Sequence, residues 1–116
     1  MIRRLLTRRP TDGPRVVYAR TGEFDAASEV IVEPDGTFRA ESLSFVTNGF
    51  RTGRLAPRQH REMVGLVAAL GPPGRFGFYD RATGVAELTV GGRLWMWPLY
   101  PPTPEIAALV RFLAAL

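Results

Sequence analysis

Short segments in which hydrophobic and polar residues alternate fill the first part of the chain. Residues 15–20, 28–33 and 37–45 each alternate as half-buried strands do. A Pro-Asp-Gly sequence at 34–36 predicts a hairpin turn between the last two, because proline presets the first turn dihedral and glycine accepts a positive φ. The next segment, 46–53, holds two glycines and an Asn-Gly pair, which predict a loop or a tight hairpin.

A helical period replaces the alternation from Pro57 onward. Four apolar residues follow the i, i+3, i+4, i+7 spacing of one helix face before a Gly-Pro-Pro-Gly sequence at 71–74 ends the helix. They are Met63, Leu66, Val67 and Leu70. A second helix is expected from Pro104, with Thr103 as its N-cap and Glu105 beside the positive end of the helix dipole. Its apolar face consists of Ile106, Leu109, Val110 and Leu113.

Three more strands are expected between the helices, over residues 75–80, 85–90 and 93–97. Gly91-Gly92 joins the last two as a two-residue hairpin turn. Alternation places one set of apolar side chains of these two strands on a common inward face. That set is expected to be Ala86, Leu88 and Val90, joined by Leu94 and Met96.

The order of elements is therefore three strands, a helix, three strands and a helix. Short hairpin connections give an antiparallel sheet, and two amphipathic helices need a sheet face to cover. We expect an α+β fold with an antiparallel sheet of about five to six strands and two helices packed on one face. A chain of 116 residues has the size of one domain, and turn residues up to Pro14 divide it into a basic leader, 1–14, and a domain, 15–116.

Positive charge is concentrated in the leader and the first strand after it. All fifteen cationic residues are arginine, and residues 1–20 hold six of them against one aspartate, a net charge of +5. Neither an export signal core of about seven apolar residues nor a membrane span of about 18 occurs. The expected location is the cytoplasm, without membrane association.

The side chains that most enzymes use are scarce. The sequence holds one histidine, His60, and neither cysteine nor lysine, which excludes a Cys-His pair, a lysine nucleophile and a two-histidine metal site. His60 is expected near the start of a solvent-wetted helix. Ser28, Ser42 and Ser44 lie in or beside predicted strands, without the sharp turn that presents a nucleophilic serine. We therefore expect a protein that is not an enzyme and that uses neither a metal nor a cofactor.

Several short motifs resemble those of the emfourin-like (protealysin-inhibitor-like) family of small protein inhibitors. They are Thr21-Gly22-Glu23-Phe24 after the first strand, Asp35-Gly36 after the second, Leu55-Ala56-Pro57 at the first helix, and the closing helix. The resemblance covers residues 15–116. It implies an antiparallel sheet with helices, and inhibition of thermolysin-type metalloproteases by loops that block the active-site cleft.

A small protein-binding domain is the function that these observations favour, and the resemblance implies a metalloprotease as the protein partner. Glycine-bearing loops can enter a cleft, and the contact residues expected there are Phe24, Thr47, Asn48, Phe50, Arg51 and Arg54. Trp95 and Trp97 share one face of their strand, where they either form an exposed contact surface or cover the edge of the core.

Two other functions stay open. In the first, a nucleic-acid-associated module binds phosphates through the leader arginines, which are Arg3, Arg4, Arg8 and Arg9. No aromatic residue in the leader is available for base stacking. In the second, a homodimer forms through an open face or edge of the sheet, and the function belongs to the assembly.

Overall fold

Strands and helices follow the hydrophobic pattern over the part of the chain that the computed structural model describes, residues 13–22, 27–43, 48–77 and 84–116. Within these ranges the strands are β1 (Val16–Thr21), β2 (Ala27–Val32), β3 (Thr37–Leu43), β4 (Asn48–Arg54), β5 (Gly74–Arg75), β6 (Val85–Val90) and β7 (Arg93–Pro98). The helices are α2 (Pro57–Ala68) and α3 (Pro104–Ala114). The predicted α+β class is confirmed.

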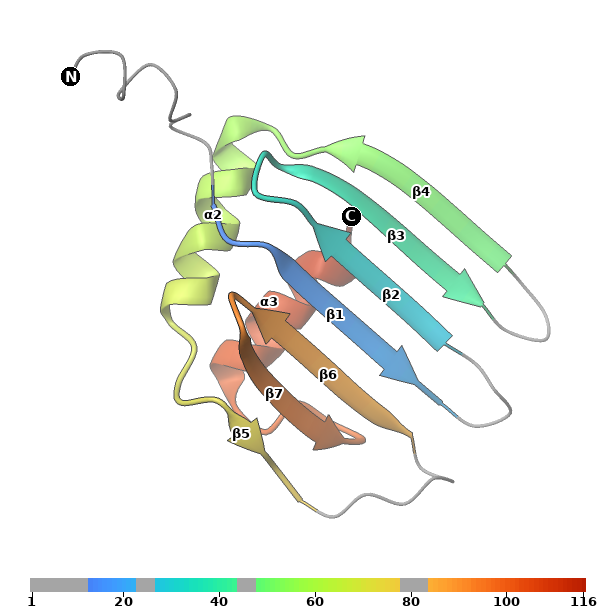
Figure 1. Ribbon diagram of the computed structural model, residues 1–116, viewed down its shortest axis with the longest axis vertical. Helices are drawn as coiled ribbons and strands as arrows, with labels where there is room; N and C mark the ends of the chain where they lie inside the picture. Colours follow the sequence, from blue (N-terminus) through green and yellow to red (C-terminus); the bar gives the residue numbers. More distant parts are fainter. Residues whose placement is uncertain (1–12, 23–26, 44–47, 78–83) are drawn as a thin grey trace.

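The seven strands form one sheet in the order β4-β3-β2-β1-β6-β7-β5 (Figure 1). Neighbouring strands are antiparallel except at one edge, where β5 pairs with β7 in parallel. The sheet therefore has more strands than the five to six expected. The additional strand is β4, because the segment 46–53 was expected to be a loop or a tight hairpin. β5 consists of Gly74–Arg75, and residues 76–77 of the expected strand 75–80 do not continue it, while residues 78–80 lie outside the described residues.

The core lies on one face of the sheet. Alternate residues of the central strands are buried there, and both helices add their apolar stripes to the same cluster. Figure 1 views the sheet from its other side, with α3 crossing behind the strands. The largest fully buried side chains are Trp95, Trp97, Met63, Leu88, Ile106, Leu109 and Leu113. Packing of both helices on one sheet face is therefore confirmed.

The turn between β6 and β7 decides where the two tryptophans point. It pairs Leu88 with Trp95 and Ala86 with Trp97, and residues paired in this way share a face of the sheet. Both tryptophans point into the core and are 0% exposed, so the hypothesis of an exposed tryptophan surface is wrong. The β7 residues expected to face inward pair instead with the outward residues of β6. They are Leu94 and Met96.

Both helices begin where the sequence predicts. Pro57 occupies the first turn of α2, and the Gln59 side chain accepts a hydrogen bond from the backbone N–H of Ala56 at 2.8 Å. The Thr103 hydroxyl caps α3 by accepting from the backbone N–H of Ile106 at 3.1 Å. Neither helix of the described residues has the length and apolar character needed to cross a membrane.

Candidate functional site

One edge of the sheet is the strand β4. It pairs with β3 through all seven of its residues, and no strand lies on its other side in the described part of the chain. Residues 49–54 are all exposed, and the Phe50 side chain is 62% exposed. A strand in this position offers a row of backbone N–H and C=O groups that another strand can pair with.

Gly53 shows how a glycine-containing segment becomes part of this sheet. It pairs with Phe38 of β3, and a Cβ at position 53 would lie 2.7 Å from the Phe38 ring. The ring therefore lies over the glycine backbone and occupies the space of the missing side chain. This cover offsets the weakness of glycine in a strand. The Asn-Gly pair at 48–49 lies within β4 and does not form a turn.

The predicted turn before β3 holds the C-terminal end of β4 in place. Asp35 accepts hydrogen bonds from the backbone N–H of Thr37 at 2.9 Å and from its hydroxyl at 2.7 Å, and Gly36 has a φ of 91°. Arg54 donates to the backbone oxygen of Asp35 at 3.4 Å. Leu55 donates its backbone N–H to the Gly36 oxygen at 2.8 Å. β4 is thus held along its inner side and at its end, while its outer side is open.

The structure divides the expected contact residues into three groups. Those that lie together along β4 are Asn48, Phe50, Arg51 and Arg54. Trp95 and Trp97 belong to the core and are not available to a partner. Those outside the described residues are Phe24, Thr47, Arg3, Arg4, Arg8 and Arg9. The nucleic-acid hypothesis, which depends on the last four, stays a prediction.

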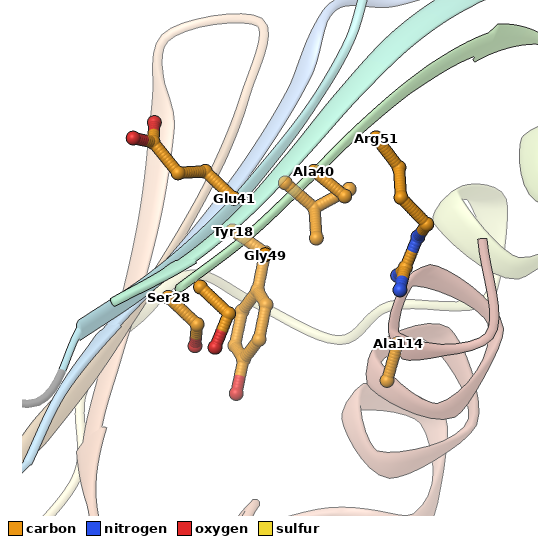
Figure 2. Close-up of a pocket in the computed structure, with 9 residues that line it drawn as sticks. Tyr18, Ser28, Ala40, Glu41, Gly49, Arg51 and Ala114 are labelled. Atoms are coloured by element: carbon orange, nitrogen blue, oxygen red, sulfur yellow. The ribbon is translucent and has the colours of Figure 1, made fainter. Parts of the chain in front are cut away.

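A cavity of about 290 Å³ lies where the helix side of β4 meets the end of α3 (Figure 2). Its apolar part includes Val30 and Ala40, and the Arg51 side chain extends from β4 toward Ala114 of α3. Glu41 also borders the cavity through its position in β3, but Figure 2 shows its side chain directed to the other side of the sheet, away from the Arg51 side chain.

Three hydroxyl groups contribute to the polar part of this cavity, those of Tyr18, Ser28 and Ser42. The Tyr18 ring is 8% exposed and stacks on Trp97, with ring centroids 6.2 Å apart and planes at 18°. Ser28 and Ser42 are direct partners in the β2–β3 ladder, so they lie side by side. Neither these hydroxyls nor the Arg51 guanidinium has a hydrogen-bond or ion-pair partner in the described structure. The cavity therefore combines free donors with an apolar lining.

His60 lies in the interior and not on the solvent-wetted surface expected for it. It is 2% exposed, because it shares the buried face of α2 with Met63 and Val67. A Cβ on Gly13 would lie 2.9 Å from His60 Nε2, and one on Gly36 would lie 3.4 Å from Nδ1. The imidazole thus fills the space between two glycines, and its Nε2 has no hydrogen-bond partner among the described residues. Among the described residues, no three His, Cys, Asp or Glu side chains form a group that could hold a metal ion.

Comparison with models of protein families gives no match, and neither does comparison with curated proteins. The interpretation of the site therefore depends on its geometry and on the short motifs. Sequence reasoning missed the cavity, although alternation does put Tyr18 and Ser28 on the inward face of their strands. What it lacked was β4, which supplies the outer wall of that cavity.

Proposed function

We propose that the chain is a small non-catalytic protein-binding domain, and that it binds by adding a strand of its partner to the free edge of β4. The observation that carries the proposal is the position of β4 at the sheet edge together with the exposure of its residues 49–54. In strand addition, main-chain hydrogen bonds provide affinity and alternate side chains provide specificity. Natural sheets usually shorten, cover or bend their edges to prevent such pairing.

Phe50 is the anchor that we propose for this interface. It lies in the middle of β4 and is 62% exposed, which is unusual for a phenyl ring without a partner. Aromatic side chains often carry most of the binding energy of an interface, because they bury a large area on contact. Arg51 and Arg54 follow on the same strand and suit carboxylate groups of a partner.

We further propose that the partner is a thermolysin-type metalloprotease, which the domain inhibits by occupying its active-site cleft. Two observations support this narrower proposal. The motifs at 21–24, 35–36 and 55–57 resemble those of the emfourin-like inhibitors. The segment expected to reach a cleft also coincides with the exposed strand β4.

Inhibition assays against a panel of thermolysin-type proteases test both parts. Phe50→Ser should weaken inhibition by about tenfold or more, as expected for an aromatic anchor. Tyr100→Ser is the matched control, because Tyr100 is 81% exposed and follows β7 rather than belonging to β4. Equal effects of the two substitutions would overturn the assignment of β4. Full protease activity in the presence of excess wild-type protein would overturn the inhibitor proposal.

The same free edge favours a second candidate, a homodimer in which β4 pairs with β4 of another copy. Antiparallel pairing of two identical strands satisfies two-fold symmetry, so this contact forms a closed dimer and covers the β4 edge of both copies. Sedimentation equilibrium over a wide concentration range should then give a dimer that Phe50→Ser weakens. A monomer at the highest concentration would contradict the dimer and leave the edge free for a different protein.

A further inference from the structure

We propose that the cavity beside β4 binds a carboxylate group, and that this carboxylate belongs to an acidic side chain of the strand that pairs with β4. The inference rests on the proposed function, because it takes strand addition as the way in which the partner arrives. It adds the chemical character of the partner: an extended segment with an aspartate or glutamate directed to the helix side of the sheet.

One of the two glycines of β4 leaves open space beside the Arg51 side chain. Side chains of a strand alternate between faces, so Gly49, Arg51 and Gly53 share the helix side of β4. A Cβ at position 49 would meet no atom within 4 Å, whereas the Phe38 ring fills the space at position 53. The guanidinium therefore has open space on the Gly49 side, and the cavity occupies it. Figure 2 shows Arg51 reaching along this wall to Ala114.

The polar groups around the cavity suit a carboxylate. An arginine guanidinium offers paired donors that match the two carboxylate oxygens, and hydroxyl groups can donate to the same oxygens. Of the hydroxyls that line the cavity, only that of Ser42 lies on β3, directly beside Gly49 of β4, and it has no hydrogen-bond partner among the described residues. The hydroxyls of Ser28 and Tyr18 lie on β2 and β1, farther from an added strand, and line the inner end of the cavity. The Glu41 carboxylate is directed away from the Arg51 side chain, so it does not neutralise the site. 

The size of the cavity and its position indicate where the carboxylate comes from. At about 290 Å³ it lies at the lower end of small-molecule sites. That volume holds a side chain more readily than a nucleotide or a large cofactor. A strand added to β4 would lie about 4.8 Å away and would direct every second side chain toward the helix side, next to Arg51. Pairs of opposite charge in such positions stabilise neighbouring strands.

Calorimetric titration of the full chain with matched probes tests the inference. The first pair consists of two blocked hexapeptides of alternating valine and threonine, which differ only by a central glutamate or glutamine. The second pair is N-acetylglutamate α-amide and its neutral glutamine counterpart, which present the side chain without a strand. We expect the glutamate peptide to bind about tenfold tighter than the glutamine peptide, as for a charge-assisted hydrogen bond. The free amino-acid derivatives should bind far more weakly than the peptide.

Three variants locate the effect. Arg51→Gln should abolish the preference for glutamate. Arg39→Gln is the matched control and should keep it, because Arg39 is an exposed arginine of the adjacent strand β3 that alternation places on the opposite face. Gly49→Val should raise the melting temperature, since valine favours strands and meets no atom there, and yet weaken the glutamate peptide by filling the cavity. A gain in stability with a loss of binding separates the site from a folding defect.

The possible failures are distinguishable. Equal binding of the two peptides would overturn the carboxylate site and still support strand addition. Binding of N-acetylglutamate α-amide as tightly as the peptide would overturn the strand as the source, and the site would then belong to a free small acid. A glutamate preference that Arg51→Gln leaves unchanged would overturn the assignment to this cavity. No binding of any probe up to about 1 mM would overturn both the inference and strand addition.

Discussion

Replacing each buried tryptophan with phenylalanine separates the packing of an indole from its hydrogen bonding. Trp95 and Trp97 lie two residues apart on β7 and are both 0% exposed. The Trp95 indole N–H donates to the backbone oxygen of Gly71 at 3.3 Å, and Arg93 lies over its ring at 5.2 Å. The Trp97 indole N–H is buried and has no acceptor in the described structure. The pair therefore differs in polar contacts while sharing burial and strand.

Both substitutions remove the same atoms, so their packing costs largely cancel in the comparison. Trp95→Phe also loses a hydrogen bond, which contributes about 0.5–1.5 kcal/mol. Trp97→Phe removes a buried donor whose lost hydration costs about 1–3 kcal/mol. The two effects add, so we expect Trp97→Phe to retain roughly 3 kcal/mol more free energy of unfolding than Trp95→Phe. For a domain of this size that corresponds to a melting temperature about 12 °C higher.

Urea unfolding followed by far-ultraviolet circular dichroism measures the difference, because that signal does not depend on the indoles. Equal m-values for the two variants are needed for the comparison, since a changed m-value indicates a changed unfolded or native state. Equal stability of the variants, or a lower stability of Trp97→Phe, would refute the reasoning from the unpaired N–H.

Three further predictions concern the scaffold. Gly84→Ala should lower the free energy of unfolding by about 3 kcal/mol or more, as measured by thermal unfolding, because Gly84 has a φ of 80° and an added Cβ would clash with the backbone oxygen of Thr21 in β1. Its control, Gly65→Ala in α2, should stabilise the protein by roughly 0.5–1 kcal/mol, since no atom lies within 4 Å of the new Cβ. A double-mutant cycle on Arg15 and Glu33, whose 2.7 Å ion pair is exposed, should give a coupling below about 1 kcal/mol. Thr103→Ala should lower the free energy of unfolding by about 1 kcal/mol through loss of the α3 cap, and an unchanged urea midpoint would contradict that role.

The hydrophobic pattern was sufficient for the fold class and for most elements, because both depend on local periodicity. The misplaced tryptophans show that one more step was available from the sequence. A two-residue turn at 91–92 makes residues 90 and 93 partners, so residues 95 and 97 share the face of residues 88 and 86. Strict alternation from that pair predicts buried tryptophans. His60 is similar, because it precedes Met63 by three residues and Val67 by seven, which is the spacing of the buried helix face.

The strand β4, in contrast, could not be predicted from the periodicity of hydrophobic residues. Its two glycines lower strand propensity, and its Asn-Gly pair is a common turn sequence. The compensation comes from Phe38, a residue of β3 whose ring covers Gly53. Such a contact depends on register between two strands, which a local pattern does not contain. The cavity beside Arg51 was missed for the same reason, since it needs β4 as a wall.

The glycines of β4 connect the weakness of this strand with its proposed use. A strand that lacks side chains at Gly49 and Gly53 gains little from packing and depends on its pairing with β3 and on the ring of Phe38. The same absence leaves room around Arg51 for a group that the domain itself does not provide. A side chain such as valine at position 49 would favour the strand, yet it would close that room. If the proposed site binds as inferred, stability and binding place opposite demands on position 49, which is the trade-off expected where a binding surface is built on an otherwise regular sheet.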